Sequence, residues 1–185
     1  MGKKKDFIRR VGWGAMAMLF VMTGVVFVVI IIWQQAHQNN NQTDSSNNLT
    51  CQTDPNAYSK PTKGKLKGTI LTNFKPIKKV SNIECIDSVV GTGAEANGNS
   101  LITVNYTGAL AKNGKIFESS LDAKQPLTSE LSGLINGWQI AIPGMKEGGQ
   151  RRILIPAALG YGSQASADIP ANSDLVFDIS LISSN

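Results

Sequence analysis

The sequence predicts a small α+β domain built on an antiparallel sheet and preceded by one transmembrane helix. Three observations predict this fold class. An uncharged apolar run occupies residues 11–33, β-rich runs separated by turn residues begin near residue 82, and one short apolar segment lies at 134–142. The chain has 185 residues, which is enough for one domain together with an anchor and a connecting segment.

The N-terminal segment is predicted to anchor the chain in a membrane. A helix over residues 11–33 would span roughly 34 Å, enough for a bilayer core of about 30 Å. Trp13 and Trp33 lie at its two ends, as interfacial aromatic residues do. Basic residues concentrate within residues 1–10, so the positive-inside rule places them in the cytoplasm. The expected location is the plasma membrane, crossed once, with the C-terminal domain extracytoplasmic.

A cleaved signal peptide is the alternative interpretation of the apolar run. Its apolar region should cover about 7–15 residues and end in small residues such as A-x-A. Here the run is longer and continues into Trp33-Gln34-Gln35, which is a poor cleavage site. The sequence therefore favours an uncleaved signal anchor.

Residues 34–80 are predicted to form a flexible polar and basic tether. The first half is rich in Asn, Gln, Ser and Thr and cannot bury enough apolar surface to offset its ordering entropy. Residues 60–79 contain seven lysines and no acidic residue. They would either contact an anionic membrane or cell wall, or form a solubilising arm, and the second interpretation is preferred.

The two cysteines, Cys51 and Cys85, leave two alternatives open. Outside the cytoplasm they could form a disulfide, which would close a loop of about 35 residues and stabilise the fold by roughly 3–4 kcal/mol. They could equally be two separate thiols. With a single histidine in the chain they offer no metal-ligand cluster, so no metal and no cofactor is expected.

The charge pattern argues against nucleic-acid binding. The net charge is +5, and the lysine runs are not interleaved with aromatic residues as a nucleic-acid surface would require. We therefore expect no nucleic-acid partner.

The soluble domain is predicted to cover residues 81–185. Asn113-Gly114 is a strong hairpin signal, and Pro143-Gly144 limits the helix within 134–142 to about two turns. Alternation along the last strand gives one apolar face, formed by Leu175, Phe177, Ile179 and Leu181. The predicted strands cover residues 84–90, 101–110, 150–155 and 175–182.

Six sequence blocks in this region carry a resemblance to a known family. Together they resemble the FKBP-type peptidyl-prolyl cis–trans isomerases in both order and spacing. The resemblance implies an antiparallel half-barrel sheet wrapped around the short helix, with a hydrophobic pocket between them. The blocks are VNYTGAL (104–110), KIFESS (115–120), LSGLINGW (131–138), IPGMKEGGQRRILIP (142–156), LGYG (159–162) and IPANSDLVFDISLI (169–182).

The resemblance also implies the activity and the site. The expected function is peptidyl-prolyl cis–trans isomerisation of Xaa-Pro bonds in extracytoplasmic proteins, without a cofactor, with proline-containing polypeptides as substrates and an FK506-like macrolide as ligand. Trp138 would form the floor of the pocket, the backbone N–H of Ile135 would bind the peptide, and the hydroxyl of Tyr161 would donate a hydrogen bond. The implied catalytic residues are Tyr106, Phe117, Glu118, Trp138, Tyr161 and Phe177, and the substrate-binding residues are Leu134, Ile135 and Ile169.

Three departures from the family pattern affect the expected activity. One is the short, Ala- and Ser-rich loop between Tyr161 and Ile169, which would alter substrate choice. Glu118 stands where the family usually has Asp, so its longer side chain would move the carboxylate relative to Tyr106. Ser129 stands where many members have an aromatic wall residue, which would weaken proline binding by roughly 1–3 kcal/mol. We therefore expect reduced isomerase activity. The alternative is a non-catalytic peptide-binding or chaperone module tethered to the membrane.

Overall fold

Within the described residues, a seven-stranded sheet carries the fold in this computed structural model, which describes residues 49–59 and 64–185. The strand order is β1-β2-β6-β7-β3-β4, and β5 pairs with β3. The elements are β1 (Gln52–Thr53), β2 (Glu84–Val89), β3 (Leu101–Leu110), β4 (Ile116–Ser119), α2 (Ser120–Ala123), β5 (Leu127–Glu130), η1 (Leu131–Gly133), α3 (Asn136–Ala141), β6 (Gln150–Ile155), η2 (Ala157–Leu159) and β7 (Leu175–Ser184).

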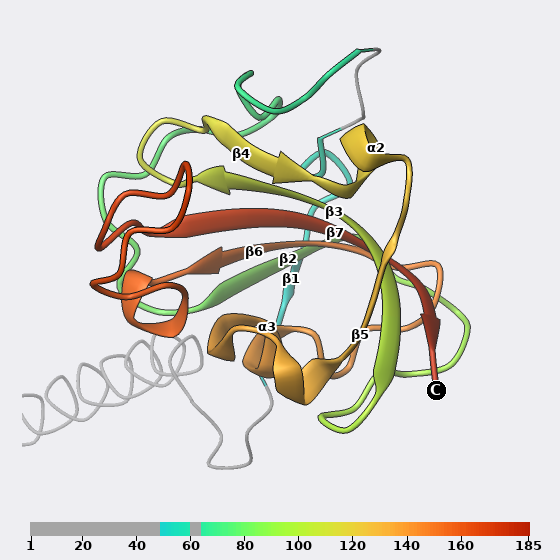
Figure 1. Ribbon diagram of the computed structural model, residues 1–185. Helices are drawn as coiled ribbons and strands as arrows, with labels where there is room; N and C mark the ends of the chain where they lie inside the picture. The colour runs from blue at the N-terminus through green and yellow to red at the C-terminus, as the bar shows by residue number, and fades with distance from the viewer. Residues whose placement is uncertain (1–48, 60–63) are drawn as a thin grey trace, which may run out of the picture. The chain divides into compact units, whose positions relative to one another are not determined.

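The sheet curves over the short helix α3, and Figure 1 shows the helix lying against one face of the strands. Residues from this face of the sheet and from α3 form the main core, and the predicted apolar face of β7 lies within it. This arrangement confirms the predicted α+β class. The four strands predicted from the β-rich runs correspond to β2, β3, β6 and β7.

The β3–β4 hairpin forms at the predicted turn. Gly114 has a φ of 70°, and its N–H donates to the carbonyl of Leu110 at 2.7 Å. The left-handed backbone at this position suits glycine, which has no Cβ to clash. The prediction of a wholly antiparallel sheet is wrong at one edge, because β1 pairs with β2 in parallel, with Gln52 opposite Ile86. The sequence carried no alternating pattern for so short a strand.

Helix α3 is short for the predicted reason and packs closely on the sheet. It ends at Ala141, before Pro143. A Cβ added to Gly137 would lie only 2.5 Å from the side chain of Ile155 on β6. The missing Cβ therefore lets the helix approach the strand, which places the next residue, Trp138, against the sheet.

The other face of the sheet is covered by residues 64–80, which we call the arm. Leu66, Leu71 and Val80 of the arm are buried against Leu154 of β6 and Val176 of β7. Figure 1 shows the arm on the side of the sheet opposite α3. Burial of these apolar side chains stabilises the docked arm, since each removes hydrocarbon surface from water.

The expected flexible tether over 34–80 and the expected domain start at 81 do not describe these segments. Residues 49–59 and 64–80 pack against the sheet. The sequence prediction gave weight to the lysines, whereas the apolar residues between them decide the packing. The remaining tether residues, 34–48 and 60–63, lie outside the described residues.

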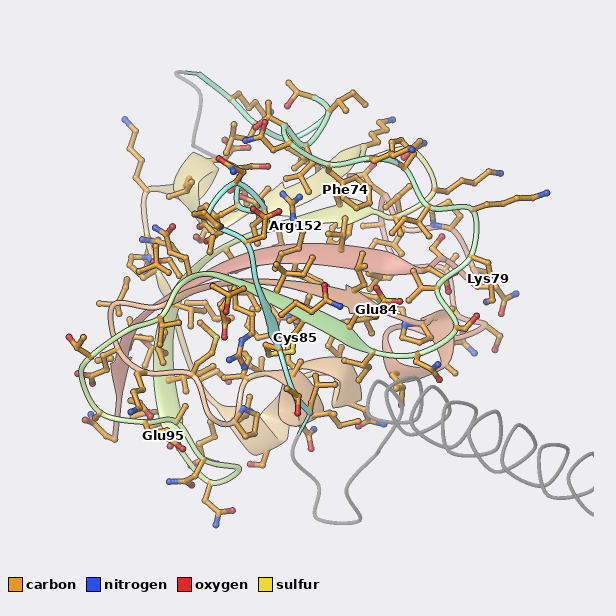
Figure 2. All side chains as sticks on the ribbon, turned by 180° about the vertical axis from the view of Figure 1, so that it is seen from behind. Phe74, Lys79, Glu84, Cys85, Glu95 and Arg152 are labelled. Atoms are coloured by element: carbon orange, nitrogen blue, oxygen red, sulfur yellow. A yellow bond between two sulfur atoms is a disulfide. The ribbon has the colours of Figure 1, made fainter. Side chains whose placement is uncertain are left out.

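A buried ion pair fastens the arm to the sheet. Arg152 and Asp178 are paired across β6 and β7, with side chains 5% and 2% exposed and an Nε–Oδ1 distance of 2.6 Å. Arg152 also donates to the carbonyl of Asn73 at 2.6 Å, and its guanidinium lies 5.5 Å from the ring centroid of Phe74. Figure 2 shows Arg152 next to Phe74 on this face. On the other side of the pair, the N–H of Ser59 donates to Asp178 at 2.9 Å.

A disulfide joins the residue before β1 to β2, at the edge of the sheet where these two strands pair. Cys51 and Cys85 are bonded, with their Cα atoms 4.7 Å apart, and Figure 2 shows the sulfur atoms at Cys85. Of the two alternatives for the cysteines, the structure has the disulfide. Cys85 is buried in the main core, so the bond ties the start of the described chain to the centre of the domain.

No helix within residues 49–59 and 64–185 is long and apolar enough to cross a membrane. The transmembrane helix predicted over 11–33 and the cytoplasmic segment predicted over 1–10 lie outside the described residues.

Candidate proline-binding site

A cavity of about 160 Å³ opens between α3 and the sheet. It is mostly apolar, and strands β3, β4, β5 and β7 as well as the start of α3 contribute to its walls. Seven of its eight lining residues are among the site residues predicted from the sequence. The lining residues are Tyr106, Glu118, Leu127, Leu134, Ile135, Trp138, Tyr161 and Phe177.

Trp138 forms the floor of this cavity. Only 3% of the residue is exposed. Its ring meets Tyr106 edge to face at a centroid distance of 5.5 Å, and it meets Phe177 at 5.3 Å with the planes at 89°. Edge-to-face contacts of this kind fix ring orientation and add to the burial energy. The Trp138 Nε1 donor is buried without a hydrogen-bond partner among the described residues. The floor is therefore rigid and presents aromatic carbon to any bound group.

Phe117 supports the pocket from behind. Its ring packs edge to face on Phe177 at 5.7 Å, and it does not line the cavity. Gly108 makes room for both rings, because a Cβ there would lie 2.6 Å from Phe117 and 2.7 Å from Phe177. Phe117 was predicted as a catalytic residue; its ring packs against Phe177, and its contact with a substrate stays a prediction.

Three polar side chains line the cavity, those of Tyr106, Glu118 and Tyr161. Burial, and then the nearby carboxylate of Glu118, raises the pKa of the Tyr106 phenol. Burial followed by the same carboxylate also raises the pKa of Tyr161. Both phenols therefore stay protonated near neutral pH and can donate hydrogen bonds. Although Glu118 is longer than the expected aspartate, its carboxylate remains close enough to Tyr106 to affect the phenol.

A backbone donor is available at the same opening. Ile135 precedes α3 with an extended backbone, φ −58° and ψ 147°. The hydrogen bonds of residues 49–59 and 64–185 leave its N–H without an acceptor. Ile135 and its neighbour Leu134 are half-buried at the cavity wall. A peptide carbonyl above the floor could accept a hydrogen bond from this N–H.

One wall residue was missed by the sequence analysis. Leu127 on β5 lines the cavity, opposite Val104 of β3 in the strand register. Ser129, which we expected to stand at a wall position, does not line the cavity, and its hydroxyl donates to the carbonyl of Glu130 at 3.2 Å. The strand alternation that places Leu127 and Ser129 on one face would have revealed Leu127 if β5 had been recognised.

Ile169 was predicted to bind substrate, and this stays a prediction. The residue is 5% exposed and belongs to the core, and it is not among the residues that line the cavity. Its backbone exchanges two hydrogen bonds with Ser166, at 2.7 and 3.0 Å. These bonds close the loop that follows Tyr161, so the backbone of Ile169 helps to fix the conformation of that loop.

Comparison with known proteins identifies this architecture. The sequence model of the family described as FKBP-type peptidyl-prolyl cis-trans isomerase matches residues 93–182. The solved structure of AtFKBP13 is 36% identical, with a TM-score of 0.52, and the match covers 58% of this chain and 96% of that one. FkpA from Escherichia coli is 34% identical with a TM-score of 0.51, covering 56% of this chain and 47% of that one.

This chain belongs to the FKBP family. Among curated relatives, FK506-binding protein 3 of Eremothecium gossypii is 46% identical over 99 residues, which are 52% of this chain and 23% of that protein. A peptidyl-prolyl cis-trans isomerase of Saccharomyces cerevisiae is 42% identical over 127 residues, 66% of this chain and 30% of that protein. The chain thus spans between 23% and 30% of the length of these two relatives.

The candidate site of the FKBP domain lies inside the range matched by the family model. The arm, β1, β2 and the disulfide all precede residue 93. Among the described residues no group of three His, Cys, Asp or Glu side chains is arranged to hold a metal ion. The pocket in this part of the chain therefore has an aromatic floor, phenol and amide donors and one carboxylate for its chemistry.

Proposed function

We propose that this protein is a peptidyl-prolyl cis–trans isomerase that acts on Xaa-Pro bonds in the cavity above Trp138. The observation that carries the proposal is the enclosure of the indole floor by Tyr106 and Phe177, with the free N–H of Ile135 at the opening. A proline ring is small, apolar and nearly rigid, which suits a rigid aromatic floor.

The reaction needs no nucleophile, because no bond to the substrate is made. Rotation about the peptide bond breaks amide resonance, at a barrier of about 18–20 kcal/mol. Before proline the two isomers have similar energies but exchange slowly. The twisted amide has a less polarised carbonyl than the planar one. An apolar cavity therefore disfavours the planar, solvated form relative to the transition state, which lowers the barrier.

The hydrogen-bond donors would hold the chain on either side of the rotating bond. In this proposal the N–H of Ile135 binds a substrate carbonyl, and the phenol of Tyr161 binds a second one at the opening. Both donors belong to ordered segments, so they are positioned before the substrate arrives. Glu118 beside Tyr106 supplies an acceptor for a substrate N–H or for the phenol.

The test is NMR exchange spectroscopy on a short Xaa-Pro peptide with the full chain in neutral detergent. Cross-peaks between the cis and trans forms should strengthen with protein concentration, and an FK506-like macrolide should abolish the effect by occupying the cavity. Saturable binding of the peptide without faster exchange would instead establish the alternative, a peptide-binding module. No binding and no exchange would refute both functions.

We further propose that the domain acts outside the cytoplasm, held at the plasma membrane by residues 11–33. The uncharged length of that run, the basic residues before it and the Cys51–Cys85 disulfide support this arrangement. Disulfides persist in oxidising compartments and are rare in the cytosol. Protease added to intact cells should remove the domain from the membrane fraction. Protection of the domain until the cells are permeabilised would contradict this orientation.

A further inference from the structure

A second cavity, of about 390 Å³, shares no lining residue with the cavity above Trp138. Three segments that are distant in the sequence form it: the arm, the β3–β4 turn and the loop before β7. Two backbone hydrogen bonds hold these segments together. The N–H of Ile77 donates to the carbonyl of Ala111 at 2.9 Å, and the N–H of Ala111 donates to the backbone carbonyl of Asp174 at 2.9 Å. The lining residues are Ile77, Lys78, Lys79, Leu110, Lys112, Asn113 and 170–174.

Positive charge dominates this cavity. Lys78, Lys79 and Lys112 line it and are exposed. Lys78 and Lys112 form no ion pair with any residue in 49–59 or 64–185. Like charges gathered around a concave surface focus the local potential and attract anions. The lysines come from two separate segments, so the fold brings together what the sequence keeps apart.

The single carboxylate in the lining is committed to the fold. The side chain of Asp174 is 9% exposed. It accepts hydrogen bonds from the N–H of Val80 at 2.8 Å and of Ala157 at 2.9 Å. Lys79 approaches it at 3.3 Å. Asp174 therefore offsets part of the positive charge of Lys79, while its oxygens accept hydrogen bonds from backbone donors. The net charge of the cavity lining stays positive.

Uncharged donors complete the lining. The side chains of Asn113, Asn172 and Ser173 line the cavity. Asn172 has a φ of 57°, and its N–H is held by the carbonyl of Gly162 at 2.7 Å. This bond holds the backbone of the loop that carries Asn172 and Ser173. No aromatic residue lines the cavity, which argues against stacked nucleobases as its ligand.

We propose that this cavity binds a phosphate-class anion, either free phosphate or the phosphate of an anionic lipid headgroup. Lysine ammonium groups bind phosphate as point charges, and amide and hydroxyl donors satisfy the remaining oxygens. Two unpaired lysines and a third shared with Asp174 match a group that carries up to two negative charges.

The first experiment is a titration of the full chain, in neutral detergent, with inorganic phosphate at constant ionic strength. The amide resonances of Asn113 and Ser173 should shift and saturate. The variant Lys78→Gln/Lys112→Gln should weaken binding by about tenfold or more, because two charge-assisted contacts are lost. The matched control is Lys146→Gln, which replaces an exposed lysine outside the cavity. Lys146 forms a backbone β-bridge with Glu95, and Figure 2 shows Glu95 at the opposite end of the domain from Lys79.

The second experiment distinguishes the two sources of phosphate. The full chain is placed in nanodiscs of phosphatidylcholine, with or without phosphatidylglycerol. Shifts at Asn113 and Ser173 that require phosphatidylglycerol and vanish in the double variant assign a lipid headgroup. Saturation by phosphate without a lipid effect assigns a free anion. If neither probe shifts these resonances, or if the double variant responds as the wild type does, the proposal is overturned.

Discussion

Arg151 binds Asp87 through two parallel hydrogen bonds, Nε to Oδ1 at 2.6 Å and Nη2 to Oδ2 at 2.9 Å. The same guanidinium donates to the carbonyl of Ala141 at 2.7 Å, at the last residue of α3. The side chain thus connects β2 with the helix that carries Trp138. Neither Arg151 nor Asp87 is among the residues that line the cavity above Trp138.

Replacement of Arg151 should therefore destabilise the domain. Arg151→Met keeps much of the side-chain volume but leaves the carboxylate of Asp87 without its partner. We expect the free energy of unfolding to fall by about 3 kcal/mol, as for other pairs that lose one buried partner. Urea denaturation followed by tryptophan fluorescence measures this. The control is Lys146→Met on the exposed surface, and equal stability of the two variants would contradict the role of Arg151.

The hydroxyl of Tyr161 should contribute to catalysis without contributing to stability. Tyr161→Phe removes only the donor at the cavity opening. We expect kcat/KM for an Xaa-Pro peptide to fall by roughly two- to tenfold, the value of one hydrogen bond. The control is Tyr58→Phe, since Tyr58 lies outside the cavity. An unchanged rate in Tyr161→Phe would remove this residue from the site.

Leu127, and not Ser129, should set the strength of proline binding at the β5 wall. Leu127→Ala removes apolar surface from the cavity, which should lower kcat/KM by about five- to thirtyfold, corresponding to roughly 1–2 kcal/mol. Ser129→Ala should change the rate by less than about twofold, because its side chain does not line the cavity. The two variants are compared in the same exchange assay. The reverse order of effects would restore Ser129 as the wall position.

Reduction of the disulfide should weaken the fold while leaving the pocket formed. Cys51 and Cys85 are 34 positions apart, and opening the loop between them should lower the free energy of unfolding by roughly 3–4 kcal/mol. Thermal unfolding with and without reductant measures the change. The variant Cys51→Ser/Cys85→Ser should match the reduced wild type and should not respond to reductant. A wild type that is equally stable when reduced would show that β1 pairing alone holds this edge.

Asp174 should make stability depend on pH in the acid range. Burial alone would raise the pKa of its carboxyl, but hydrogen bonds from Val80 and Ala157 and the contact with Lys79 lower the pKa below its ordinary value of 3.8. Its contribution is therefore complete above that value and is lost as the pH falls through the lower pKa of the folded state. Asp174→Asn should show a shallower loss of stability between about pH 5 and pH 2. The free energy of unfolding is measured by urea denaturation at each pH. If it falls with decreasing pH as steeply in Asp174→Asn as in the wild type, the prediction is contradicted.

The sequence predicted the strands and the helix because each carries a strong local signal. The turn at Asn113-Gly114 and the stop at Pro143 acted where expected. The elements that were missed are short: β1 and β5 depend on pairing with distant strands, and no local pattern marks them. The arm was misjudged for a related reason, since its apolar residues gain their partners only when the sheet exists.

The sequence predicted which residues gather around the cavity better than it predicted which of them line it. The quoted blocks identified seven of the cavity residues, because each belongs to a recognisable motif. They could not distinguish a residue that lines the cavity from one directly behind it. Phe117 and Ile169 are as apolar as their neighbours, and the core that contains them also contains Trp138 and Phe177 of the cavity. The cationic cavity could not be predicted either, because its lysines belong to segments more than thirty positions apart.

The disulfide between Cys51 and Cys85 also determines how the domain would respond to mechanical tension. A pull applied to the chain before Cys51 passes through the bonded sulfur atoms directly into β2. Residues 52–84, including the docked arm, then lie on a closed side loop that carries little of the load. The arm is thereby shielded from the force, which is taken by β2 and its antiparallel partner β6.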